Sequence, residues 1–248
     1  MQEPNNNFTA KKSLGQNFLH APNVIGKMIH AARIGVEAGG EADEIVFEVG
    51  PGKGALTEKL LATGIRVIAI EKDDRAIDFL KEKFASSMST RQFTLIHGDV
   101  LEIDPENIGL KGLNYVIAAN IPYYITGEFL RKFLETQFPP KRMILMLQKE
   151  VAKRISVNTA VNSGSNREKE SILSISVKAY GSPKFVTTVP ARFFRPIPNV
   201  DSALLYIDNI SKDFFTAENI AIDEKSFFEV VKTGFAHKRK VLIKNLES

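Results

Sequence analysis

The sequence predicts an α/β protein built on a doubly wound parallel sheet. Short apolar runs alternate with amphipathic stretches from residue 43 to about residue 148, the succession that parallel βαβ units produce. A glycine-rich turn follows the first of these runs, and acidic residues or an asparagine end the next three. Because such sheets bind ligands beyond the carboxyl ends of their strands, these observations predict both the fold and the edge that carries the site.

Apolar periodicity and turn residues predict the individual elements. Strands are expected at "EIVFEV", "RVIAIE", "FTLIHGD", "YVIAAN" and "RMILMLQ". Helices are expected at "GALTEKLLATG", which Gly64 closes, at "DRAIDFLKEKFASS" and at "GEFLRKFLETQ". The runs "SISVKAYG", "FVTTVP" and "SALLYI" are expected to be further strands, and the polar stretch "VNTAVNSGSNREKE" a loop.

One domain boundary is expected, near residues 210–213. It separates a catalytic domain, residues 1–210, from a small helical lobe, residues 211–248. The segment from residue 225 onward carries six basic and two acidic residues, which is the whole net charge of +4. Its basic cluster is interleaved with Phe235 and aliphatic residues, which is typical of a helix that docks on a core and turns a phosphate-binding edge outward. A solvated helix face is the alternative.

Composition excludes several classes of protein. The 248 residues contain no cysteine, so disulfides and thiolate metal sites are excluded. The four histidines lack metal-ligand spacing, so no metal is expected. No apolar run approaches the length of a membrane span, and the N-terminal residues lack the apolar core of a signal peptide. A cytoplasmic protein without membrane partners is therefore expected.

The turn "EVGPGKGAL" predicts a cofactor site. Gly50, Gly52 and Gly54 stand at a strand-to-helix junction, where glycines let a ligand approach the backbone closely. Their spacing differs from the G-x-G-x-x-G of dinucleotide binders, which weighs against a dehydrogenase. Glu71 ends the next strand, where a carboxylate can accept both ribose hydroxyls, and Asp99 ends the third, placed to accept from an adenine amino group. An adenosine-bearing cofactor without phosphates is expected.

Several motifs together resemble those of the ribosomal RNA adenine-N6 dimethyltransferase family, and most closely its bacterial small-subunit branch. In order along residues 11–246 they are "LGQNFL", "FEVGPGKG", "IE", "GDVL", "NIPYYIT", "LQKEVAKRI", "FFRPIPNVDSA" and "FAHKRKVLIKNL". The resemblance implies a Rossmann-like class I methyltransferase sheet and S-adenosylmethionine as methyl donor. The cofactor residues that it implies are Gln16, Asn17, Leu19, Gly50, Glu71, Asp99 and Asn120.

The stretch "NIPYY" is expected to perform the chemistry on adenine. The N6 lone pair is delocalised into the ring, so N6 attacks a methyl group only when acceptors draw its hydrogens out of the ring plane. The Asn120 side-chain carbonyl and the Ile121 backbone carbonyl, directed by Pro122, are expected to be these acceptors. Tyr123 is expected to stack on a flipped adenine. Phe194 matches the Phe of the family's F-x-P motif, so the resemblance implies that it is the opposite wall. Because two phenylalanines are adjacent, Phe193 is the alternative to Phe194.

The expected activity is N6,N6-dimethylation of adenines in small-subunit 16S rRNA, with two adjacent adenines of a hairpin loop as targets. The partner is then rRNA in a subunit assembly intermediate, bound by a monomer partly through Lys238, Arg239 and Lys240. The family pattern continues past Leu246, so a shortened C-terminal lobe is expected. The alternatives are methylation of large-subunit 23S rRNA, as in macrolide-resistance relatives, and a non-catalytic RNA-binding assembly factor.

Overall fold

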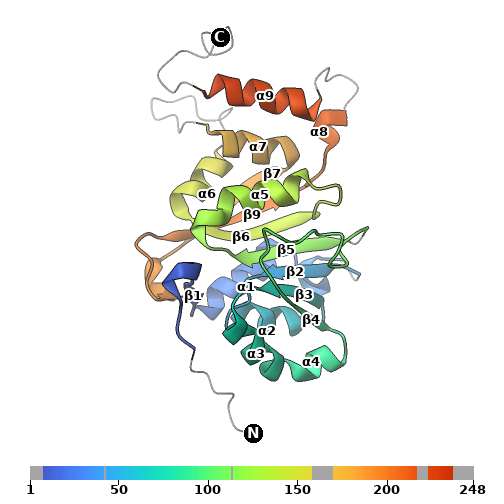
Figure 1. Ribbon diagram of the computed structural model, residues 1–248, viewed down its shortest axis with the longest axis vertical. Helices are drawn as coiled ribbons and strands as arrows, with labels where there is room; N and C mark the ends of the chain where they lie inside the picture. The colour runs from blue at the N-terminus through green and yellow to red at the C-terminus, as the bar shows by residue number, and fades with distance from the viewer. Residues whose placement is uncertain (1–7, 42, 113, 158–169, 217–222, 237–248) are drawn as a thin grey trace.

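A seven-stranded mixed sheet organises the protein (Figure 1). The computed structural model describes residues 8–41, 43–112, 114–157, 170–216 and 223–236. The strand order is β4-β3-β2-β5-β6-β9-β7, and the five strands from β4 to β6 are parallel. β9 runs antiparallel to β6, and β7 runs antiparallel to β9. A separate two-stranded ribbon pairs β1 with β8.

The bounds of the elements are as follows. The strands are β1 (Phe18–Leu19), β2 (Ile45–Val49), β3 (Arg66–Glu71), β4 (Phe93–His97), β5 (Tyr115–Asn120), β6 (Arg142–Gln148), β7 (Ser182–Val189), β8 (Phe194–Arg195) and β9 (Ser202–Asp208). The helices are α1 (Pro22–Ala31), α2 (Ala55–Leu61), α3 (Asp74–Lys83), α4 (Ala85–Ser89), α5 (Thr126–Glu135), α6 (Lys149–Ser156), α7 (Ile172–Tyr180), α8 (Asp213–Thr216) and α9 (Glu224–Gly234). Single 3₁₀ turns are η1 (Lys12–Leu14), η2 (Val36–Ala38), η3 (Tyr123–Ile125) and η4 (Ala191–Phe193).

The five inner strands of the sheet are buried on both faces, which explains why these strands are continuous apolar runs in the sequence. Successive side chains of a strand point to opposite faces. In β2, Phe47 and Val49 join a core that α5, α6 and α7 complete, whereas Val46 joins a core completed by α1, α2 and α3. The predicted α/β fold is confirmed, and the five parallel strands lie where the sequence places them.

Two sequence expectations differ from the structure. The run "SISVKAYG" was expected to be a strand but lies in helix α7. Ser171 caps this helix by accepting from the Ser174 N–H, and the buried residues Ser174, Val177 and Tyr180 recur every three residues, as on one face of a helix. The sheet is also not parallel throughout. β7 and β9 are joined by residues 190–201 without a crossover helix, so they pair antiparallel.

Helices α8 and α9 pack beside α7 at the end of the molecule away from β4 (Figure 1). Tyr180 of α7 contacts the rings of Phe215 and Phe228, and its hydroxyl donates to Glu224 Oε1 at 2.6 Å. The expected basic cluster Lys238, Arg239 and Lys240 lies outside the described residues. Within the described ranges, no helix is both long and apolar enough to cross a membrane.

Candidate active site

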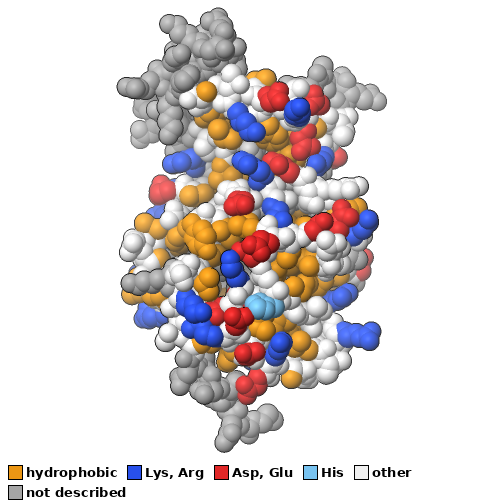
Figure 2. Space-filling model, viewed as in Figure 1, with side chains coloured by type: hydrophobic (Ala, Val, Ile, Leu, Met, Phe, Trp, Pro, Cys, Tyr) orange, Lys and Arg blue, Asp and Glu red, His pale blue; other side chains and the backbone are white. Residues whose placement is uncertain are grey.

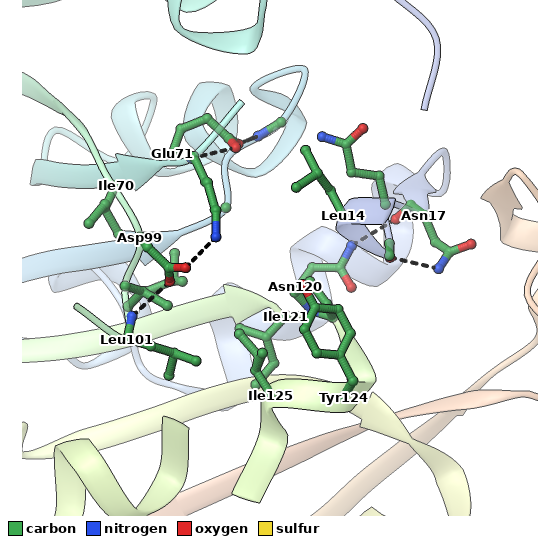
Figure 3. Close-up of a pocket in the computed structure, with 18 of the residues that line it drawn as sticks. Leu14, Asn17, Ile70, Glu71, Asp99, Leu101, Asn120, Ile121, Tyr124 and Ile125 are labelled. Atoms are coloured by element: carbon green, nitrogen blue, oxygen red, sulfur yellow. Dashed lines mark hydrogen bonds and ion pairs between the residues drawn. The ribbon is translucent and has the colours of Figure 1, made fainter. Parts of the chain in front are cut away.

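A pocket opens at the carboxyl edge of the parallel strands, where the sequence predicts the site. Figure 3 shows Glu71 and Asp99 on one side of this pocket and Leu14 and Asn17 on the other, with Asn120, Ile121 and Tyr124 between them. The ends of β2, β3, β4 and β5 therefore supply most of the wall, and the chain before α1 supplies the rest. The lining comprises residues 14–18, 49, 50, 52, 70–72, 98–101 and 120–125.

The glycine turn after β2 is fixed by Glu71 on the neighbouring strand. The Gly52 N–H donates to Glu71 Oε2 at 3.0 Å, and Gly52 has a φ of 56°. A Cβ added to Gly52 would stand 2.9 Å from the Phe18 ring, so the backbone and Phe18 approach more closely than any side chain permits. The turn thus holds its backbone against the pocket without placing side-chain volume in it.

Glu71 is a buried acid whose carboxylate accepts hydrogen bonds from backbone N–H groups. Besides Gly52, the N–H groups of Lys72 and Asp73 donate to its Oε1 at 2.8 and 2.9 Å. Burial raises the pKa of Glu71 above its usual range, although these three bonds oppose the shift. A carboxylate has about four acceptor sites, so one remains for a ligand.

Asp99 occupies the next strand end and is paired with a lysine that the sequence analysis missed. Its Oδ2 meets Lys72 Nζ at 2.5 Å, and its Oδ1 accepts from the Leu101 N–H at 2.9 Å. Burial opposes ionisation of Asp99, but these two donors outweigh it and leave its pKa below the usual range. Lys72 directly follows Glu71 in the sequence, and that adjacency is the signal that could have identified it.

Asn120 ends β5 with a defined amide orientation. Its Nδ2 donates to the Asn17 backbone carbonyl at 3.1 Å, which assigns the amide and turns Oδ1 to the other side. No described donor bonds this Oδ1 or the carbonyl of Ile121. Both predicted acceptors therefore remain available at the pocket, and Asn17 contributes through its backbone.

Tyr123 follows in the η3 turn, with its ring held by its hydroxyl. The hydroxyl lies 2.7 Å from Ser202 Oγ at the start of β9. Burial raises the pKa of Tyr123, so the phenol stays neutral near pH 7. A neutral ring fixed at both ends suits base stacking better than proton transfer. Ser202 stands within "NVDSA", and the pairing of β9 with β6 brings it here.

Three predicted site residues do not line the pocket. Gly54 instead permits close packing of helices, since a Cβ there would lie 2.5 Å from the Phe84 ring. Leu19 pairs with Phe194 in the β1–β8 ribbon. Phe194 is only 1% exposed and belongs to the core beneath α1 and α3, so in this conformation its ring cannot face a base. The remaining predicted cofactor and catalytic residues (Gln16, Asn17, Gly50, Gly52, Glu71, Asp99, Asn120, Ile121, Pro122 and Tyr123) all line the pocket.

The pocket wall before α1 is fastened by Asp73, another residue that sequence reasoning missed. Asp73 caps α3 and accepts from Gln16 Nε2 at 2.8 Å and from the Arg75 guanidinium at 2.6 and 2.9 Å. Arg75 also donates to the Thr9 carbonyl at 3.0 Å. Gln16 thus contributes by anchoring the wall. Asp73 lies two residues after Glu71 at the N-cap of a predicted helix, and this position is the sequence signal by which it could have been identified.

We expect Asp73→Asn to destabilise the fold at neutral pH. The Arg75 side chain lowers the pKa of Asp73 to about 2, whereas an unfolded Asp has a pKa of about 3.9. The folded pKa is the lower one, so ionised Asp73 stabilises the fold above about pH 4, and this stabilisation is lost as the pH falls towards 2. It amounts to about 2–3 kcal/mol.

Urea denaturation of wild type and variant from pH 2 to 7 measures this difference. Asp74→Asn is the matched control, because Asp74 is adjacent but its side chain is 82% exposed, and its effect should stay within about 0.5 kcal/mol. Equal stability of Asp73→Asn and wild type at pH 7 would contradict the anchoring role.

Stacking of Phe194 on the target base remains a prediction, with the condition that the ring leaves the core when RNA binds. Phe194→Leu keeps an apolar side chain, so the fold should persist. On the stacking hypothesis RNA affinity falls by about 1–3 kcal/mol, while cofactor affinity is unchanged. Phe193→Leu is the matched control. If Phe193→Leu weakens RNA binding and Phe194→Leu does not, the stacking wall is Phe193.

The side chains that line the pocket fit an adenosine-bearing cofactor without phosphates. Two acids, Glu71 and Asp99, stand at adjacent strand ends above the apolar side chains of Ile70, Val100 and Leu101. Among the described lining residues, Lys72 is the single cation, and it is paired with Asp99. A phosphate would find no unpaired cation among the described residues of this wall.

Comparisons with known proteins identify the family of this chain. A family model described as ribosomal RNA adenine dimethylase matches residues 7–248. Ribosomal RNA small subunit methyltransferase A of Dehalococcoides mccartyi (strain CBDB1) is 41% identical over 237 residues, which cover 96% of this chain and 74% of the relative.

Two crystal structures have the same architecture. A dimethyladenosine transferase from Plasmodium falciparum superposes with a TM-score of 0.74 at 28% identity, covering 93% of this chain and 75% of that one. The 23S rRNA methyltransferase ErmE superposes with a TM-score of 0.70 over 93% of this chain and 84% of its own, but at 22% identity this likeness concerns the fold alone. The chain belongs to the ribosomal RNA adenine dimethylase family of S-adenosylmethionine-dependent methyltransferases, as its motifs predict.

Proposed function

We propose that this enzyme transfers methyl groups from S-adenosylmethionine to N6 of adenines in small-subunit rRNA. The observation that carries the proposal is the locked amide of Asn120, whose Oδ1 stays free beside the carbonyl of Ile121 at the pocket. S-adenosylmethionine supplies an electrophilic methyl group when it is bound. Glu71 and Asp99 are the residues that would hold its adenosine.

Residues of this chain promote the reaction by orienting the adenine amino group. Asn120 Oδ1 and the Ile121 carbonyl accept the two N6 hydrogens, which restores lone-pair character to N6 as the methyl arrives. An amide performs this role without adding negative charge beside a positively charged sulfur. Much of the rate then comes from orientation. No strong general base is required, because N6 releases its proton readily once it is cationic.

The adenine has to leave its stack to reach these acceptors. The Tyr123 ring, held by Ser202, offers it an aromatic face at the pocket. Addition of a second methyl group to the same nitrogen uses the remaining hydrogen in the same way. We extend the proposal to two adjacent adenines of a hairpin loop, methylated by a monomer on an assembly intermediate of the small subunit.

Relatives favour the small subunit over the large one. The 41% identical relative is named a small subunit methyltransferase, whereas the likeness to the 23S rRNA methyltransferase ErmE extends only to the fold. A boundary between β9 and α8 would separate the methyltransferase domain from the C-terminal lobe. That boundary is part of the proposal.

Methyl incorporation tests the proposed function. Unmethylated small subunits and bare large-subunit rRNA are incubated separately with the enzyme and labelled S-adenosylmethionine, and modified adenines are located by mass spectrometry. Dimethyladenosine in the small-subunit rRNA alone is the expected result. Methylation confined to the large-subunit rRNA would establish the rival specificity, and binding without incorporation would establish a non-catalytic assembly factor.

A further inference from the structure

The loop between β7 and β9 presents two arginines without an acidic partner among the described residues. Arg192 and Arg195 are both exposed, and neither lies within ion-pair distance of a described carboxylate. On the face drawn in Figure 2, by contrast, basic and acidic side chains are interspersed. That face is therefore not generally basic, and what distinguishes Arg192 and Arg195 is that two unpaired arginines stand in one short loop.

The loop holds these arginines in place. Asp201 closes it, because its Oδ1 accepts from the Ala191 N–H at 3.0 Å and its backbone carbonyl accepts from the Lys149 N–H at 3.0 Å. The Arg195 NH1 group donates to the carbonyls of Arg192 and Phe194 at 3.2 and 3.0 Å. The Arg192 guanidinium lies 5.3 Å from the centre of the Phe193 ring. The other N–H groups of Arg195 remain free of described partners, and a pre-oriented guanidinium loses less entropy on binding an anion.

The same loop adjoins the active-site pocket. Arg195 pairs with Phe18 in the β1–β8 ribbon, and Phe18 lines the pocket. At the end of the loop Ser202 bonds the Tyr123 hydroxyl. The loop and the pocket rim also expose apolar surface, since Ile197, Val200 and Tyr124 are 58%, 46% and 70% exposed. Cations interleaved with exposed apolar and aromatic groups are typical of a surface that binds unstacked RNA.

Three other described arginines, Arg66, Arg91 and Arg154, are also exposed and lack an ion pair, and position separates Arg192 and Arg195 from the first two. Arg66 begins β3 and Arg91 precedes β4, so both lie at the amino edge of the sheet, opposite the pocket. A base that leaves its stack needs its strand held beside the pocket, and the guanidinium fork matches phosphate oxygens. Only cations at the carboxyl edge are placed to do this.

We propose that residues 191–201 form a phosphate-binding clamp, in which Arg192 and Arg195 hold the RNA backbone next to the adenine that enters the pocket. This inference rests on the proposed function, because it takes rRNA as the ligand. It assigns to a loop of the catalytic domain a contact that the sequence analysis placed only in residues 238–240.

The test compares two double variants of equal charge. Arg192→Gln/Arg195→Gln removes the clamp, and Arg66→Gln/Arg91→Gln removes two exposed, unpaired arginines from the opposite edge. The probe is small-subunit rRNA transcribed in vitro, titrated at several salt concentrations. At 0.1 M salt each lost phosphate contact weakens binding about five- to eightfold, so the clamp variant should bind about 25- to 60-fold more weakly. Its slope of log K against log salt should flatten by about 1.4–1.8.

By calorimetry, the clamp variant should bind S-adenosylmethionine with the same affinity as the wild type. That result would show that its pocket is intact. The proposal would be overturned if the clamp variant bound RNA with the affinity and salt slope of the wild type. It would also be overturned if the opposite-edge variant lost as much RNA affinity as the clamp variant. If methyl transfer by the wild type proves specific for large-subunit rRNA, the proposed function fails. The clamp is then measured on that RNA with the same two variants.

Discussion

Asn120→Ala is expected to reduce the rate of methyl transfer by about 100- to 1,000-fold, the loss seen when one stabilising hydrogen bond is removed from a transition state. The Asn120 acceptor acts on N6 mainly while the methyl arrives, so its loss lowers kcat more than it weakens binding. RNA affinity should change little. Cofactor affinity should fall modestly, because Asn120 also lines the cofactor side of the pocket.

Asn120→Asp provides the matched control. It keeps an acceptor at the same place but removes the donor to the Asn17 carbonyl and adds a charge beside the sulfonium. We expect it to retain cofactor binding and to turn over more slowly than wild type. Single-turnover rates at saturating S-adenosylmethionine measure both variants. Near-normal turnover by Asn120→Ala would refute the role assigned to this side chain.

The sequence predicts the site residues at the ends of the parallel strands well, because the position of each depends on its own strand. A strand that ends in glycines, Glu71, Asp99 or Asn120 brings its last residue to the same edge whatever the rest of the fold does. Pro122 and Tyr123 follow directly, so their place at the pocket is set by chain continuity. These are the positions at which the expected and observed placements coincide.

The rest of the site depends on contacts that no local pattern encodes. Gln16 meets Asp73 across 57 residues, and Asn120 meets the Asn17 carbonyl across 103. Phe194 is buried where β8 pairs with β1. Strands of two residues have no recognisable sequence pattern, so this pairing could not be predicted. Likewise, the alternation of Ile175, Val177 and Ala179 resembles that of a strand, although these residues lie in α7, and the capping residue Ser171 precedes the run "SISVKAYG".

Glu71→Ala is expected to weaken S-adenosylmethionine binding by about 1.5–3 kcal/mol, the range for a hydrogen bond to a charged group. It also removes the acceptor of the Gly52, Lys72 and Asp73 N–H groups, two of which are buried. The free energy of unfolding without cofactor should therefore fall by about 2–3 kcal/mol. Calorimetry and urea denaturation measure these losses separately. Glu58→Ala, which removes a carboxylate that is 60% exposed on α2, is the control for charge alone.

The pH dependence of binding distinguishes a ligand contact from a purely structural role of Glu71. Burial raises the pKa of Glu71, and the protonated acid is the poorer acceptor. Wild-type affinity should therefore decline on acidification at a higher pH than an exposed Glu, with a pKa of about 4.3, would give. Glu71→Gln cannot lose this charge, so its affinity should be weaker and independent of pH over the same range. If Glu71→Ala loses stability but binds S-adenosylmethionine with unchanged affinity, Glu71 only fastens the glycine turn. The ribose hydroxyls then have another partner.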